Sequence, residues 1–171
     1  MDRLSDVELK EKKYLITKKM RINNKDVEIS LFPNETLLET LRNNGYTEVK
    51  NGCEEGECGA CMVLIDDKPV NSCQVLTMSV LDKDIKTVKG IGTLHEPDVI
   101  QQSYVDAGAV QCGFCTPGFI ISTYALLKRN PDPTEKEIKE ALDGNICRCT
   151  GYVKILDGVK LAAKKLKEKN K

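Results

Sequence analysis

The stretch NGCEEGECGAC at residues 51–61 decides the fold, because three of the eight cysteines of this 171-residue chain lie in it at a distinctive spacing. These three follow the order C-x4-C-x2-C, and a fourth comes after eleven further residues; together they are the first quartet, Cys53, Cys58, Cys61 and Cys73. The second quartet is a C-x2-C followed, after thirty-one residues, by a C-x-C, at Cys112, Cys115, Cys147 and Cys149. Four thiolates are what a two-iron, two-sulfide cluster requires, so two quartets indicate two clusters.

Iron–sulfur ligation explains the quartets better than disulfides or zinc do. The order of the first quartet is that of plant-type 2Fe–2S ferredoxins. Disulfides belong to oxidising compartments, whereas residues 1–19 have mixed charge and no apolar run of signal-peptide length, so we expect a cytoplasmic protein. Cys147 and Cys149 are also too close in sequence to pair comfortably. Zinc sites usually combine two C-x2-C pairs, a form that neither quartet has, but on spacing alone zinc stays the alternative.

Other residues of the sequence indicate which kind of cluster the quartets would bind. Gly52, Gly56 and Gly59 stand where a loop around a cluster needs positive φ and close backbone approach, with amides directed at sulfur. The single histidine, His95, excludes a Rieske centre, which needs two histidines on one iron. We expect His95 to be a surface or cap residue.

Composition excludes several other functions. Formal net charge is zero, and no basic platform with aromatic residues is present, which argues against nucleic acid as a partner. The apolar runs are far too short to span a membrane, so no membrane insertion is expected. Aromatic residues make up only 5% of the chain, so two small cores would be lean, and metal binding should contribute to folding. The lysine-rich ends, including residues 164–171, are expected to be solvated tails.

The front half of the sequence predicts an α+β sheet. Strands are expected at residues 18–22 and 27–31, joined by a turn at Asn23-Asn24, and again at 62–65 and 85–88, with a turn at Asp66-Asp67 after the third strand. Between the two pairs, a helix with Asn34 as its N-cap places Leu37, Leu38 and Leu41 on one face and ends before Gly45.

From about residue 97 the pattern is helical. Helices are predicted at residues 97–107 and 118–129, the second with Thr116 as N-cap and Pro117 at the first helical position. Thr134 and Glu137 form a possible capping box for a third helix. The last helix carries a core stripe of Ile155, Val159, Ala162 and Leu166. Residues 90–96 are the expected interdomain connector.

Four motifs give the chain a family resemblance over roughly residues 18–161. They are the loop at 51–61, NSC at 71–73, QCGFCTPG at 111–118 and GNICRCTGY at 144–152. The chain resembles the small two-cluster iron–sulfur subunit of the molybdenum hydroxylases, the family of xanthine dehydrogenase and aldehyde oxidoreductase. The departures are Asp67, at a turn position where relatives commonly have glycine, and a slightly longer stretch at residues 95–100.

The resemblance implies an N-terminal tail at 1–17, a plant-type ferredoxin-like β-grasp domain at 18–92 and a C-terminal four-helix-bundle domain at 93–171. Each domain would hold one 2Fe–2S cluster, the first quartet in the former and the second quartet in the latter. Gln111 and Cys149 match positions that approach the molybdenum–pterin cofactor in relatives, although Gln111 would also serve as a loop hydrogen-bonding residue.

The resemblance also implies a role. The chain would be the electron-transfer subunit of an oxidoreductase, with no catalytic residue of its own. Its partners would be a large molybdenum-binding subunit and a FAD-binding subunit, and electrons would end on the flavin or on an external acceptor. The stretch EGECGAC at 55–61 leans towards purine or other N-heteroaromatic substrates. The alternatives are a free-standing two-cluster ferredoxin-like carrier and a zinc-stabilised interaction module.

Overall fold

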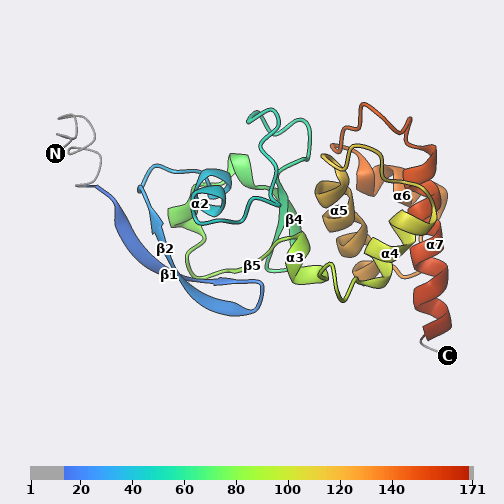
Figure 1. Ribbon diagram of the computed structural model, residues 1–171, viewed down its shortest axis with the longest axis horizontal. Coiled ribbons are helices and arrows are strands. Elements are labelled where there is room, and N and C mark those ends of the chain that lie inside the picture. The colour runs from blue at the N-terminus through green and yellow to red at the C-terminus, as the bar shows by residue number, and fades with distance from the viewer. Residues whose placement is uncertain (1–13, 170–171) are drawn as a thin grey trace.

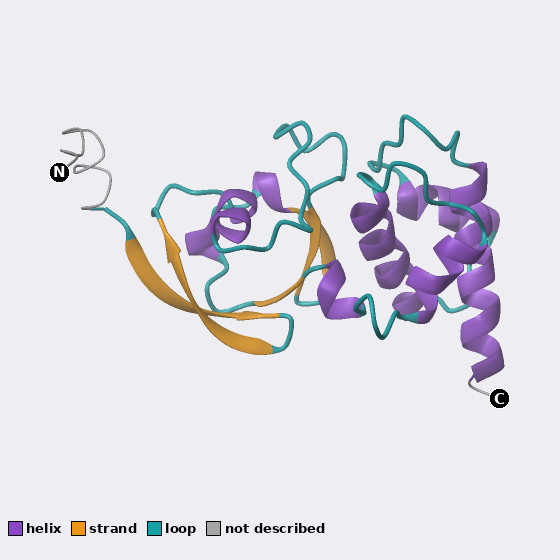
Figure 2. Ribbon diagram, in the orientation of Figure 1, coloured by secondary structure: helices purple, strands orange, loops and turns teal. Residues whose placement is uncertain are grey.

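The computed structural model describes residues 14–169 and joins a strand-rich half to a helical half (Figure 1). Most of the predicted tail at 1–17 and the last two residues of the lysine-rich end lie outside the described residues. The strands all lie in the first half of the chain, with an α-helix between them, and the second half is helical, so the predicted mixed α+β class is confirmed (Figure 2). Within residues 14–169, no helix is both long and apolar enough to cross a membrane.

A hairpin opens the described chain. Strand β1 (Ile16–Ile22) pairs antiparallel with β2 (Lys25–Leu31) across the predicted Asn23-Asn24 turn. Both turn residues have positive φ, 52° and 63°, which is the backbone that two-residue hairpin turns require and that asparagine tolerates. The sequence therefore predicted this hairpin and its turn correctly.

Three short strands complete a sheet of order β2-β1-β5-β3-β4. Strand β3 (Met62–Ile65) pairs antiparallel with β4 (Lys68–Asn71), and β5 (Asp84–Lys86) runs parallel to β1 and antiparallel to β3. The strand predicted at 85–88 was partly wrong, because Val88 begins helix α3 (Val88–Ile91). Asp66 and Asp67 form the expected β3–β4 turn, with φ of 48° and 64°.

Helix α2 (Leu37–Asn43) buries its three leucines against the sheet, as predicted. Its N-cap is Thr36, so the prediction of Asn34 was wrong. The Thr36 hydroxyl accepts the Glu39 N–H at 3.2 Å, and the Glu39 carboxylate accepts the Thr36 N–H at 2.8 Å. This reciprocal capping box satisfies two amides at the helix start, which a single cap at Asn34 would not do.

Four helices form the other half: α4 (Val99–Asp106), α5 (Thr116–Arg129), α6 (Glu135–Leu142) and α7 (Val153–Lys169). The capping box of α6 is confirmed. On α7 the predicted stripe is buried except for Leu166, which is partly buried. Helix α5 begins at Thr116 with Cys115 as its N-cap, one residue earlier than predicted, and the Cys115 side chain makes no cap hydrogen bond.

Each half has its own core, and α5 lies beside β3 and β4 where the halves meet (Figure 1). Helix α3, which covers part of the predicted connector, packs on the helical core through Val88 and Ile91. Because the two cores contain few aromatic side chains, a buried hydrogen bond in the helical half should contribute measurably to stability. The Tyr104 hydroxyl lies 2.7 Å from Thr123 Oγ1, both fully buried.

We predict that Thr123→Val lowers the free energy of unfolding by about 1–3 kcal/mol, because it leaves the buried Tyr104 hydroxyl only the Phe119 carbonyl at 3.5 Å. The double variant Tyr104→Phe/Thr123→Val removes both polar partners and should lose less than the two single variants added together. Urea unfolding of the four proteins measures this, and additive losses would contradict the coupling.

Candidate metal centres

The first quartet lies on two neighbouring segments. Cys53, Cys58 and Cys61 belong to the loop between α2 and β3, and Cys73 sits in a short 3-10 turn (Ser72–Gln74) that follows β4. Long-range hydrogen bonds tie the segments together: Asn71 Nδ2 donates to the Gly56 carbonyl at 2.6 Å and Gln74 Nε2 to the Glu54 carbonyl at 3.1 Å. The late fourth cysteine is thereby brought back to the other three.

The positive φ that we predicted for three glycines of the first-quartet loop is present at two of them. Gly56 and Gly59 have positive φ, 81° and 68°, whereas Gly52 does not. Gly52 instead allows close approach, since a Cβ there would lie 2.7 Å from Cys58 Sγ. The predicted amide–sulfur contact is present: the Glu55 N–H donates to Cys53 Sγ at 3.4 Å.

The first quartet divides into a half-buried pair and a buried pair. Cys58 contributes to the pKa shift of Cys53, and Cys73 contributes to that of Cys61, so each of these cysteines interacts with its partner. The Glu55 and Cys58 amides lower the pKa of Cys53 to about 7, whereas burial raises the pKa of Cys61 to about 11. Cys53 is therefore readily deprotonated, whereas Cys61 needs a bound cation to become a thiolate.

The second quartet comes from two loops at one end of the helices. Cys112 and Cys115 lie between α4 and α5, and Cys147 and Cys149 lie between α6 and α7. Cys149 Sγ is 3.6 Å from Cys112 Sγ, and Cys115 and Cys147 each contribute to the pKa shift of the other. This quartet too is two pairs, one exposed and one further inside the protein.

The more buried pair of the second quartet, Cys115 and Cys147, shows pKa shifts in opposite directions. Burial, and then the neighbouring Cys147, raise the pKa of Cys115 to about 12. Burial also acts to raise the pKa of Cys147, but the Thr150 hydroxyl at 3.2 Å and the Thr150 amide at 3.4 Å bring it down to about 7. The Cys147 amide donates to the Tyr152 hydroxyl at 3.0 Å, which fixes this part of the loop.

The two quartets face one another across a shared cavity of about 240 Å³. Its lining includes Cys53 and Cys58 of the first quartet and all four cysteines of the second. The Ile146 N–H donates to the Cys58 carbonyl at 3.0 Å, which links the two cysteine loops directly. Residues nearly ninety positions apart thus meet between the two candidate centres.

The paired thiols fit two-iron clusters. A 2Fe–2S cluster held by four cysteines takes two on each iron, whereas a single zinc ion draws its four ligands around one point. Two pairs in each quartet, with donors directed at sulfur, are the arrangement that the two-iron cluster requires.

The remaining predicted residues lie at the surface. Gln111 is exposed beside Cys112, and His95 is exposed in the loop before α4, as predicted for a surface residue. Sequence reasoning did not single out Asn145, Ser122 or Tyr152 as contacts around the cysteine loops. Asn145 and Tyr152 stand within the quoted GNICRCTGY motif, which was a usable signal, whereas nothing in the sequence marked Ser122.

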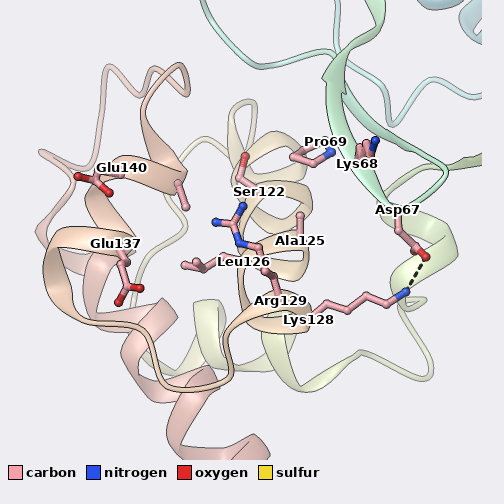
Figure 3. Close-up of a pocket in the computed structure, with 11 residues that line it drawn as sticks. Asp67, Lys68, Pro69, Ser122, Ala125, Leu126, Lys128, Arg129, Glu137 and Glu140 are labelled. Atoms are coloured by element: carbon pink, nitrogen blue, oxygen red, sulfur yellow. Dashed lines mark ion pairs between the residues drawn. The ribbon is translucent and has the colours of Figure 1, made fainter.

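A cavity of about 670 Å³ lies away from the cysteines, between the β3–β4 turn and helices α5 and α6 (Figure 3). Asp67 points across it to Lys128 of α5, and their charged atoms are 2.6 Å apart. A second lysine, Lys86, lies 3.8 Å from the same carboxylate. The departure at Asp67 therefore adds an ion pair between the two halves, while its φ of 64° keeps the turn that glycine would make.

We predict that Gly59→Ala destabilises the fold more than Gly108→Ala, although both glycines have a φ of +68°. A Cβ at Gly59 would lie 2.5 Å from the Gly144 carbonyl, whereas nothing lies within 4 Å of one at Gly108. Both variants carry a left-handed backbone cost of about 1–3 kcal/mol, and only Gly59→Ala adds a steric clash. Thermal unfolding of the two variants tests this, and equal losses would contradict the close approach.

Comparison with known proteins agrees with this geometry. Residues 20–87 match the model of the 2Fe-2S iron-sulfur cluster binding domain, and residues 87–160 match that of a second 2Fe-2S binding domain. The nicotinate dehydrogenase small FeS subunit of Eubacterium barkeri is 46% identical over 88% of this chain and 96% of that protein. The xanthine dehydrogenase iron-sulfur-binding subunit of Escherichia coli O157:H7 is 43% identical over 84% of this chain and 92% of that protein. In a crystal structure of quinoline 2-oxidoreductase from Pseudomonas putida 86, one chain superposes with a TM-score of 0.85 and 35% identity, covering 91% of this chain and 98% of the other.

Proposed function

Because the chain belongs to the family of small iron–sulfur subunits of the molybdenum hydroxylases, we propose that it conducts electrons from a partner's molybdenum–pterin site to a flavin subunit or an external acceptor. It is the iron–sulfur subunit of an oxidoreductase and is not catalytic alone. A 2Fe–2S cluster bound by each quartet would supply the one-electron chemistry. The single observation that carries the proposal is the meeting of the two quartets at the Ile146–Cys58 hydrogen bond.

Each quartet has a specific task in this proposal. We assign Cys112 with Cys149 to one iron and Cys115 with Cys147 to the other, because the first two sulfurs lie 3.6 Å apart and, after burial, Cys147 is the group that raises the pKa of Cys115 most. By the same reasoning Cys53 pairs with Cys58, and Cys61 with Cys73. The second quartet, with its exposed outer pair and the exposed Gln111, would face the molybdenum–pterin cofactor, and the first quartet would pass electrons outward.

The two separate cores support a division into two domains. We propose a plant-type ferredoxin-like β-grasp domain at residues 18–92 and a four-helix-bundle domain at 93–171, each built around one quartet. The partners would be a large molybdenum-binding subunit and a FAD-binding subunit, in the cytoplasm, where eight free thiols stay reduced. An N-heteroaromatic substrate is supported by the names of nicotinate and xanthine dehydrogenases among the relatives.

Anaerobic purification of the native assembly tests the partner proposal. Affinity capture of the full chain from its source is expected to bring down a large molybdenum-containing chain in a fixed ratio, together with a flavin-containing chain. A captured chain that carries its clusters but migrates alone at native ionic strength would contradict the subunit model and would favour the free-standing carrier.

A further inference from the structure

Asn145 lies at the point where the two cysteine loops and helix α5 meet. Its side chain is buried, with 6% exposed, between the end of α6 and Cys147. The Ser122 hydroxyl of α5 donates to Asn145 Oδ1 at 2.7 Å, and Asn145 Nδ2 donates to the Gly59 carbonyl in the first-quartet loop at 3.4 Å. One carboxamide therefore contacts both loops and the helix.

The backbones of these segments approach one another closely. A Cβ on Gly118 would lie 2.2 Å from the Gly59 carbonyl oxygen, and a Cβ on Gly59 would overlap the Asn145 carboxamide. Glycine at both positions lets the backbones touch. Gly59 directly follows Cys58, Gly118 lies in the first turn of the helix capped by Cys115, and Asn145 lies two residues before Cys147.

We propose that Asn145 is a positioning residue that sets the separation and coupling of the two clusters, an inference that rests on the proposed function. Asparagine suits this role because its side chain presents an acceptor and donors in one rigid plane, so that it bonds Ser122 and Gly59 at once. It also holds the adjacent Ile146 N–H on the Cys58 carbonyl. Within residues 14–169 the Asn145 side chain makes no hydrogen bond to a cysteine sulfur, and it acts through the loops.

Isosteric replacement separates positioning from ligation. Asn145→Asp keeps the acceptor for Ser122 but turns the Gly59-facing donor into a carboxylate oxygen opposite a carbonyl, so the two loops should move apart. Ser122→Ala removes the other hydrogen bond and leaves the carboxamide in place. Asn34→Asp, at an exposed position before α2, makes the same change in charge away from the cysteines.

The experiment uses the full chain with its clusters, reduced anaerobically and examined by electron paramagnetic resonance, which reports magnetic coupling between two reduced clusters. We expect Asn145→Asp to keep wild-type iron content and absorption, to lose part of the inter-cluster splitting, and to slow electron equilibration between the clusters. Ser122→Ala should show a smaller change in the same direction, and Asn34→Asp none.

Unchanged splitting in Asn145→Asp would overturn the inference. Should Asn145→Asp fail to take up iron, Ser122→Ala decides, and wild-type splitting in that variant would then overturn it. A wild-type chain without iron would instead refute the proposed function, so the two failures are distinguishable.

Discussion

Replacing Cys115 with serine in the assembled complex should abolish electron flow to the natural acceptor while the substrate pocket in the partner subunit stays intact. Cys115 is the N-cap residue of α5, and in the proposed assignment its loss would remove one of the two sulfurs that Cys115 and Cys147 would supply to one iron. Substituting a residue that hydrogen-bonds to a metal ligand already lowers metal affinity or activity by up to about 10²-fold. Loss of the ligand itself should lower turnover by at least the same factor. Steady-state turnover with the natural acceptor measures the effect.

Thr116→Ser is the matched control, because it changes the neighbouring residue of the same helix and removes only a methyl group. It should retain near-wild-type turnover. Undiminished turnover in the Cys115→Ser complex would refute conduction through the second quartet.

Phe119→Ala is expected to lower the free energy of unfolding by about 3–5 kcal/mol, the usual cost of emptying a buried phenylalanine site. Phe119 is 1% exposed in the helical core, and its ring lies edge-on to Tyr152 with centroids 6.3 Å apart. Because the Tyr152 hydroxyl accepts the Cys147 amide, the cavity should also loosen the second-quartet loop. Chemical denaturation with the clusters bound gives the loss.

Leu94→Ala supplies the comparison for truncating an apolar side chain to alanine at a surface site, since Leu94 is 98% exposed. It should cost about 0.5 kcal/mol or less. Similar losses in both variants would show that Phe119 does not anchor the helical core.

The sequence predicted features that depend on neighbours along the chain. The Asn23-Asn24 turn, the leucine face of α2 and the Thr134–Glu137 capping box each depend on residues within one or two turns of each other, and all three are present. The grouping of cysteines into pairs required the fold, because spacing states which cysteines are near in sequence and not which thiols meet. Cys112 meets Cys149 only because α5, α6 and α7 bring their loops to one end.

Several missed features depend on distant segments or on competition between neighbouring caps. Thr36 is the N-cap, and not Asn34, because Glu39 forms a reciprocal pair of hydrogen bonds with Thr36. The Asn145 contact with Gly59 spans 86 residues, and no periodicity in either segment indicates it. Parallel pairing of β5 with β1 was equally invisible, because three residues carry too short a pattern to specify a partner.

The most direct test of two thiolate-bound clusters is metal and sulfide analysis of the anaerobically purified chain, combined with electron paramagnetic resonance after dithionite reduction. We predict about four irons and about four acid-labile sulfides per chain, with two distinct signals, one from each quartet. A colourless protein that contains zinc or no metal, and that gives no signal on reduction, would contradict the account.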